Sequence, residues 1–274
     1  MNKKLIASAI AGLGLMASGS ASAIVVGGVD FGNPGTTHLE TTTLAETFIS
    51  GNNQQLQGYG QVNTVNGNLL YAGANRLYFV FDQYMSANYS PTSVDFTLGQ
   101  VRVYLLPTFN LLSQASYNPD APINSNLEII QAGSLWAVMN GHSFNGTPNT
   151  LASAGIFTGA TVNFTGAGLL DVVGGGLADV QAYLDSSSFS DGVGGFADVN
   201  IGTSGTNGGP AGAGLNRFDN TAGCGTGLAQ AGQWCIAGSA DLRGPTVVPE
   251  PGVLALVGLG LLGMGVSLRK RKAA

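Results

Sequence analysis

The carboxyl-terminal end of the chain restricts its topology more than any other segment. Residues 247–251 include two prolines, and a helix cannot continue through them because each lacks an amide hydrogen and favours extended geometry in the preceding residue. An uncharged apolar run follows at residues 252–268; as a helix it would reach roughly 25 Å at about 1.5 Å per residue. Four cations end the run: Arg269, Lys270, Arg271 and Lys272. The pattern predicts a transmembrane helix over 252–268 whose basic end stays in the cytoplasm while the rest of the chain crosses the membrane.

This order of elements resembles a known targeting signal. Pro249-Glu250-Pro251, a short apolar helix and an Arg/Lys cluster are similar to the PEP-CTERM sorting signal of Gram-negative bacteria, which is also labelled an ice-binding protein C-terminal motif. The resemblance covers residues 247–272. It implies processing at or near the tripeptide by an exosortase, a membrane thiol protease, and then release or transfer to the cell surface. A plain single-pass anchor behind a proline-rich neck is the alternative.

The amino terminus agrees with export. Two lysines near the start are followed by an apolar region at residues 5–16, and Ala21 and Ala23 form a small-residue cleavage site. This arrangement predicts a signal peptide over 1–23 that signal peptidase removes. The exported domain then covers 24–246; an uncleaved anchor is the alternative. We expect an inner-membrane-anchored precursor and a mature form at the cell surface or outside the cell.

The charge of the exported region excludes some partners. Residues 24–248 contain four arginines, no lysine and fourteen acidic residues, so their formal net charge is close to −10. The value of −5 for the whole chain hides this, because six cations lie in the two targeting segments. Nucleic acid and anionic lipid surfaces are therefore not expected as partners, since phosphate binding requires clustered Lys and Arg.

Short apolar alternations separated by Asn, Gly and Pro clusters predict an all-β domain. The expected strands cover 76–81, 94–98, 101–105, 127–130, 135–139, 161–164 and 196–201. The first three of these are interpreted as separate strands that are antiparallel neighbours, and residues 181–184 fit either a helical turn or a strand. The spacing favours one antiparallel domain, a β-sandwich or jelly roll, with a helix in each targeting segment.

Two cysteines, Cys224 and Cys235, occur in the exported region. In an oxidising compartment this pair is expected to form a disulfide. A metal site is not expected, because His38 and His142 are far from both cysteines in sequence and there is no second cysteine pair. A surface calcium site stays open as an alternative, although no segment fits a calcium-binding loop. We expect no cofactor.

The sequence offers little for catalysis. His142-Ser143 resembles a nucleophile elbow, but the glycine that the turn requires two residues after the serine is Asn145. Five aspartates are candidates for the carboxylate pair of a glycoside hydrolase, and we interpret most of them as solvated turn residues: Asp171, Asp179, Asp185, Asp191 and Asp198. The sequence therefore predicts a protein that is not an enzyme, with no catalytic residue to name.

A weaker resemblance concerns the body of the chain. Residues 41–44, 56–63, 77–82 and 168–172 are similar to exported PEP-CTERM proteins associated with flocculation. The resemblance implies a structural surface or matrix protein that acts with exopolysaccharide in flocs or biofilm. It brings no catalytic residues with it.

Two other classes of function stay open. The first is a carbohydrate-binding module, for which Trp234 is a candidate exposed contact, whereas Trp136 is expected in the core. Ice is a more remote ligand, because the threonine cluster at 41–43 is short for a regular array. The second is a secreted hydrolase, which would bring acidic side chains or histidines together in a deep cleft.

Overall fold

The structure, a computed structural model, describes residues 23–33, 35–109, 111, 125–158, 162–206 and 234–246. Both terminal helices expected from the sequence lie outside these residues. The strands are β1 (Val25–Val26), β2 (Val29–Asp30), β3 (Thr36–Thr47), β4 (Gln55–Gln61), β5 (Thr64–Val65), β6 (Asn75–Ser90), β7 (Ser93–Pro107), β8 (Ser134–His142), β9 (Asn149–Ile156), β10 (Asn163–Val173), β11 (Phe189–Ser190), β12 (Phe196–Ala197), β13 (Val199–Thr206) and β14 (Trp234–Thr246). Two short helices accompany them, α2 (Ser125–Gln131) and α3 (Ala178–Leu184).

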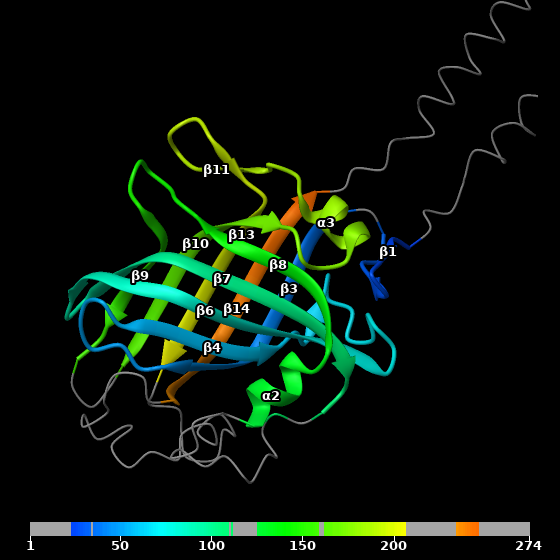
Figure 1. The fold of residues 1–274 in the computed structure, drawn as a ribbon, viewed down its shortest axis with the longest axis horizontal. Coiled ribbons are helices and arrows are strands. Elements are labelled where there is room, and N and C mark those ends of the chain that lie inside the picture. The colour runs from blue at the N-terminus through cyan, green and yellow to red at the C-terminus, as the bar shows by residue number, and fades with distance from the viewer. Residues whose placement is uncertain are drawn as a thin grey trace, which may run out of the picture.

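The main sheet closes into an eight-strand barrel (Figure 1). Strands β3, β4, β6, β7, β8, β10, β13 and β14 follow one another around it in chain order, each antiparallel to the next, and β14 pairs back onto β3. The all-β antiparallel prediction is confirmed, but the sandwich and jelly-roll forms are wrong. Inward–outward alternation is the same in a sandwich and in a barrel, so the sequence pattern does not distinguish them.

One position of the barrel is filled by two strands. β8 lies between β7 and β10 at one end, and β9 takes the same position at the other end, running in the same direction. The chain leaves the wall at residues 143–148 and returns. Thr150 bridges the break, since its hydroxyl donates to the carbonyl oxygens of Leu98 at 2.6 Å and Phe96 at 3.3 Å. The two strands are thus one barrel strand interrupted by an outward loop.

The prediction of two separate strands at 94–98 and 101–105 is wrong, because both segments belong to β7. These segments form one strand with an irregular point, where Leu98 and Gly99 have φ values of +63° and +96° and Leu98 is 64% exposed. Across the pair, Gln83 of β6 also has a positive φ of +63°. A Cβ on Gly99 would lie 2.2 Å from the Tyr84 ring, so this position requires glycine. Gln83 and Gly99 both drop out of the β6–β7 ladder here without a register shift, so the inward-facing set of side chains moves by one residue, which made one strand resemble two.

The other expected elements agree in part. Strands at 76–81 and 135–139 are confirmed within β6 and β8, and residues 181–184 are helical in α3. The expected strand at 127–130 is wrong, because this segment lies in α2, where Ile130 packs on the barrel's outer wall. The segment 196–201 divides into β12 and β13 at Asp198. The segment 161–164 is described from residue 162 onward, and β10 begins at Asn163.

Alternate side chains fill the barrel interior, among them Phe79, Phe81, Val101, Val103 and Met139. In Figure 1, helix α3 lies at the upper right of the barrel and the amino-terminal hairpin β1–β2 lies below it at the right-hand side. The Gly27 N–H between β1 and β2 donates to Asp179 of α3 at 2.9 Å and joins the two. Trp136 is fully buried there, and its indole N–H donates to the Gly27 carbonyl at 3.1 Å. The expectation that Trp136 belongs to the core is confirmed.

Part of the outer wall is also buried. Tyr59 of β4, Tyr78 of β6 and Tyr104 of β7 point outward and pack in a second apolar cluster with Ile130 of α2. This cluster, which also contains Ala45, Val80, Leu106 and Leu111, defines what we call the covered wall. The central part of β6 is therefore buried on both faces, which explains its continuous apolar run.

Candidate functional site

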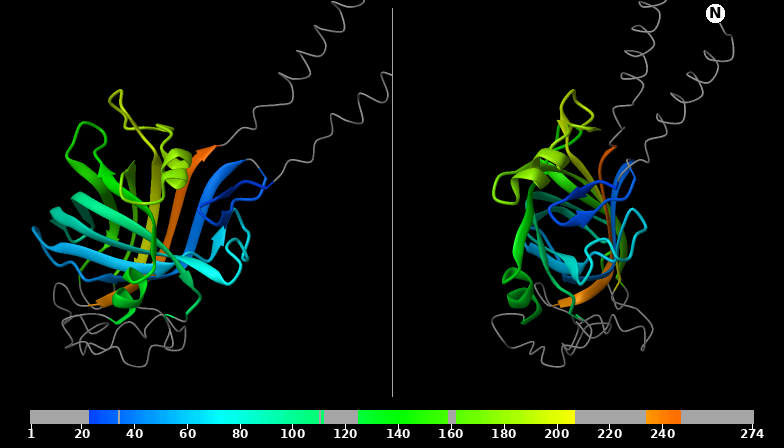
Figure 2. Two further views of the ribbon diagram at one scale, coloured as in Figure 1. Left: turned by 45° about the vertical axis from the view of Figure 1, so that its right-hand side comes forward. Right: turned by 90° about the vertical axis from the view of Figure 1, so that its right-hand side faces the viewer.

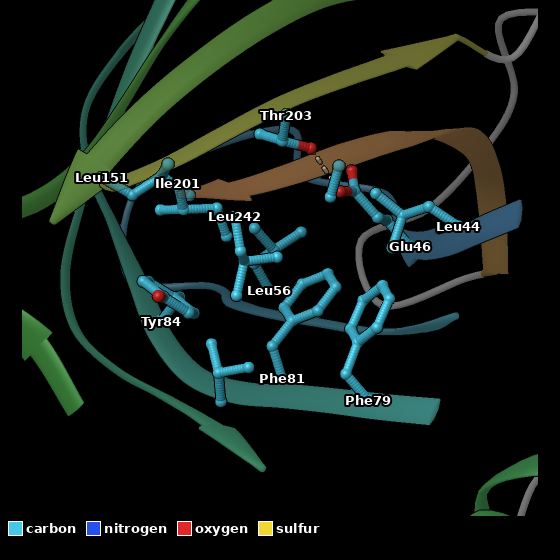
Figure 3. Close-up of a pocket in the computed structure, with 12 residues that line it drawn as sticks. Leu44, Glu46, Leu56, Phe79, Phe81, Tyr84, Leu151, Ile201, Thr203 and Leu242 are labelled. Carbon is cyan, nitrogen blue, oxygen red and sulfur yellow. Dashed lines mark hydrogen bonds between the residues drawn. The ribbon is translucent and has the colours of Figure 1, made fainter. Parts of the chain in front are cut away.

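A small cavity in the barrel interior holds a buried carboxyl group (Figure 3). Glu46 of β3 is 2% exposed and points into a lining that is otherwise mostly apolar, including Leu56, Phe79 and Leu242. The Thr203 hydroxyl donates to Glu46 Oε1 at 3.3 Å, whereas Oε2 has no hydrogen-bond partner among the described residues. Burial raises the pKa of Glu46 to about 8, against a smaller opposing effect of the Thr203 hydrogen bond. The carboxyl group is thus mostly protonated and neutral at pH 7.

Tyr84 lines the same cavity from β6. Its hydroxyl is buried without a hydrogen-bond partner in the described part of the chain, and burial raises its pKa. The cavity volume is about 20 Å³, and an adjoining cavity that also reaches Glu46 has about the same volume. Such a space holds about one water molecule. The interior is therefore a packed core with a neutral acid in it, and a substrate of ordinary size does not fit.

Two larger hollows lie on the outer face of the barrel. The first, which we call the loop cleft, has a volume of about 410 Å³. It is lined by Phe144, Asn145, Ala167, Gly168, Leu169, Ser190, Asp191, Gly192 and Asn200. Its walls are the outward loop at 143–148 and the loop between β11 and β12, and its floor is the outer face of β10 and β13. The Asn145 N–H donates to the Asp191 carbonyl at 2.7 Å and joins the two loops.

His142 lies at the base of the outward loop between two carboxylates. Its Nδ1 is 2.8 Å from Asp171 Oδ2, and its Nε2 is 3.7 Å from Asp191 Oδ2. The N–H groups of Val193 and Gly195 donate to Asp191 Oδ1 at 2.8 Å each. The Val193 N–H, helped by that of Gly195 and by His142, holds the pKa of Asp191 below its usual range. These contacts fix the loops, and the sequence did not predict that Asp171 and Asp191 meet at His142.

Two of the remaining candidate aspartates, Asp179 and Asp198, have structural partners. Asp198 is 5% exposed and accepts the N–H groups of Ser186, Ser187 and Val172 at 2.7–2.9 Å. Asp179 accepts the Gly27 N–H at 2.9 Å. The interpretation of these residues as solvated turn acids is therefore wrong for Asp198, which fixes the segment that follows α3 and binds it to β10. Among the residues that the structure describes, no group of three metal-ligating side chains is found.

The second hollow, which we call the polar groove, covers β3, β13 and β14 on the outside and has a volume of about 450 Å³. Hydroxyl, amide and carboxylate side chains line it, among them Thr42, Asn63, Ser204, Ser239 and Asp241. Within the threonine cluster at 41–43, Thr41 is buried and Thr42 is exposed. These two residues therefore do not share one flat exposed face.

Most of the predicted site residues lie outside the described residues. This holds for Ala21, Cys224, the tripeptide Pro249-Glu250-Pro251 and the four basic residues 269–272, and for the side chains of Trp234 and Cys235. Ala23 is described and exposed, and the fold begins directly behind it: the Ile24 N–H donates to the Gly32 carbonyl at 2.8 Å. In the described ranges, no helix is long and apolar enough to cross a membrane.

Both ends of the described domain lie together. β14 ends at Thr246, which pairs with Thr36 at the start of β3. Figures 1 and 2 show the end of β14 beside the start of β3 and near α3. The start of β3 and the end of β14 therefore lie at the same end of the barrel.

Comparison with known proteins gives one match. A family described as the PEP-CTERM protein-sorting motif matches residues 247–272. No curated protein matches the chain, and no solved structure does. The match covers the predicted tail and begins at the residue after β14. The chain thus carries a PEP-CTERM sorting motif directly behind a β-barrel, and this motif supports export, processing by an exosortase and sorting to the cell surface.

Proposed function

We propose that this protein is a non-enzymatic structural component of the cell surface or extracellular matrix that acts with exopolysaccharide in floc or biofilm formation. The observation that carries the proposal is the sorting motif at residues 247–272. In the precursor, signal peptidase removes 1–23 and the apolar segment 252–268 holds the chain in the inner membrane until exosortase acts. The barrel supports a structural role because its interior is packed around cavities of about 20 Å³.

A variant of the tripeptide tests the sorting part. Replacement of Pro249-Glu250-Pro251 by three alanines is expected to leave the precursor in the inner-membrane fraction, because the protease no longer recognises its substrate. The control is a double alanine variant of Leu69 and Leu70, which are 64% and 71% exposed and lie far from the tail in sequence. Normal release of the tripeptide variant would refute the proposal.

A second experiment tests the matrix role. Cells that lack the protein are expected to form weaker flocs, and the protein recovered from wild-type cells is expected to co-sediment with their exopolysaccharide. Full floc strength without the protein, together with no co-sedimentation, would contradict this role even if sorting proceeds as proposed.

A discrete carbohydrate-binding module is the second candidate, and the loop cleft favours it over ice binding. The secreted-hydrolase alternative would need acidic side chains or histidines that converge in a hollow. Asp171 and Asp191 meet at His142 beside the loop cleft, where their contacts fix the loops. Glu40 and Asp241 face the polar groove together. Both are already engaged: Thr64 donates to Glu40 at 2.9 Å, and Asp241 is bound to His38 and Arg243. These contacts favour a binding surface over a pair of catalytic acids.

A further inference from the structure

The loop cleft has the lining of a sugar-binding site. We propose that it binds a neutral polysaccharide chain, with the Phe144 ring against one face of a sugar and the amides of Asn145 and Asn200 on its hydroxyl groups. This inference rests on the proposed function and names the surface and the class of glycan through which that function would operate.

The first argument is the way the cleft is built. The interruption between β8 and β9 breaks the row of backbone hydrogen bonds that a continuous strand would make with β7. The Thr150 hydroxyl donates to the carbonyl oxygens of Phe96 and Leu98 at this break. The loop that results is held by backbone contacts: the Phe144 N–H donates to Asn149 at 3.1 Å and the Asn145 N–H to Asp191 at 2.7 Å. The β11–β12 loop is fixed in turn by the carboxylate of Asp191. Both walls are thus preorganised, which lowers the entropy cost of binding.

The second argument is the chemistry of the lining. An aromatic ring offers a flat apolar surface, which suits the C–H face of a sugar ring. Amides provide both donors and acceptors, and hydroxyls do the same, which suits the ring's hydroxyl groups. The loop cleft combines Phe144 with Asn145, Asn200 and Ser190. Ala167 and Gly168 form a low floor beneath them, so a ring can approach the sheet.

The third argument is charge. The arginines of the described ranges are already bound: Arg102 to Asp82, Arg243 to Asp241, and Arg76 to the carbonyls of Gly73 and Asn75. Asp171 and Asp191 lie beside the loop cleft. An acidic polysaccharide would therefore meet carboxylates, and a neutral one avoids this repulsion.

The fourth argument is the direction in which the surface continues. Cross-strand register places Ala167, Gly202, Asp241 and Glu40 in one row across β10, β13, β14 and β3. This row joins the loop cleft to the polar groove over about 14 Å at the usual strand spacing. Gly202 has nothing within 4 Å of the place where a Cβ would be. A chain of several sugars therefore fits this face better than a single sugar.

Binding to soluble neutral glucans and mannans tests the inference, with alginate as the acidic comparison. The protein is the processed form recovered from cells. We expect Phe144→Ala to weaken binding by about tenfold or more, as removal of a central aromatic contact commonly does. Asn145→Gly removes the amide and suits the backbone, because Asn145 has a φ of +55°; it is expected to weaken binding severalfold.

Phe196→Ala is the matched control. Phe196 is 57% exposed in the same loop region, but it does not line the loop cleft, so its loss should leave binding unchanged. Wild-type affinity in Phe144→Ala and Asn145→Gly would overturn the loop cleft as the site while leaving the proposed function standing. Tighter binding of alginate than of every neutral glycan would overturn the neutral class. No binding to any polysaccharide, including the cells' own, would overturn both proposals.

Discussion

The covered wall and the polar groove are two outer faces of one barrel with opposite chemistry. On the covered wall, Tyr59, Tyr78 and Tyr104 point outward and are buried beneath α2 and its neighbours. Along the polar groove, the outward positions are Gly202, Ser204, Ser239 and Asp241 and no helix in the described ranges packs over them. Strands of the first face are buried on both sides, and those of the second on one side. The first face contributes to stability, and the second is left uncovered by the described helices.

The largest expected effect is the loss of a tyrosine from the covered wall. Tyr78 is fully buried, stacks on Phe109 with ring centroids 4.7 Å apart, and exchanges hydrogen bonds with its backbone N–H and carbonyl at 2.9 Å. Tyr78→Ala should lower the free energy of unfolding by about 3–5 kcal/mol. Tyr78→Phe keeps the ring and should cost about 1–3 kcal/mol. Denaturant unfolding measures both, and a Tyr78→Ala protein as stable as wild type would break the comparison.

The second largest effect on stability is expected from Glu46. This residue lies inside the barrel on β3, the strand that borders both faces. Its pKa is about 8 in the folded protein, so the folded state keeps a proton that the unfolded state has lost above pH 4.5. Stability should therefore fall as pH rises from about 4.5 to about 8, by about 3 kcal/mol at pH 7. Glu46→Gln should remove this part of the slope and stabilise the protein at neutral pH. A variant that follows the wild-type pH profile would show that Glu46 is not buried as a neutral acid.

Two glycines on the strands of the polar groove differ in the space around them. A Cβ on Gly238 of β14 would lie 1.8 Å from the Ser204 carbonyl oxygen, whereas a Cβ on Gly202 of β13 meets nothing within 4 Å. Gly238→Ala should cost about 1–3 kcal/mol through overpacking, and Gly202→Ala should change stability by less than about 0.5 kcal/mol. Thermal unfolding of both proteins compares them directly. Equal losses would mean that these strands do not pair as described.

The smallest effect is expected from the hydroxyls of the polar groove. The Ser239 hydroxyl lies 2.9 Å from that of Ser204 on the neighbouring strand, in a partly exposed position. Ser239→Ala should therefore shift the free energy of unfolding by no more than about 0.5 kcal/mol. A loss comparable to that of Tyr78→Ala would place this face in the stabilising core and contradict its assignment as a free surface.

The sequence predicts the class of the fold better than its form. Apolar alternation in 76–81 and 135–139 is a local property, so these strands are confirmed. Barrel closure depends on β10 meeting β13 and β14 meeting β3, and no local pattern encodes such pairing. The predictions of two strands across Leu98–Gly99 and of a strand at 127–130 fail for a related reason: tertiary packing overrides a short apolar run.

Only the tail part of the site could be predicted from the sequence, because its features follow one another directly along the chain. A proline-rich neck, an apolar segment and a basic end need no partner from elsewhere in the chain, and the family match covers the same residues, 247–272. The loop cleft instead joins Phe144 to Asn200 through the interrupted strand and the β11–β12 loop. The sequence analysis identified Asn145 only as the residue at the position where a nucleophile elbow requires glycine. No local sequence pattern indicated that it lines a cleft.

Intact-mass analysis of the fractionated protein, from cells with and without an exosortase, tests the sorting claim most directly. The predicted result is a mature chain that starts at Ile24 and loses its tail near Pro249 only when the enzyme is present. A tail that stays uncut in both strains would contradict exosortase sorting and leave a membrane-anchored barrel.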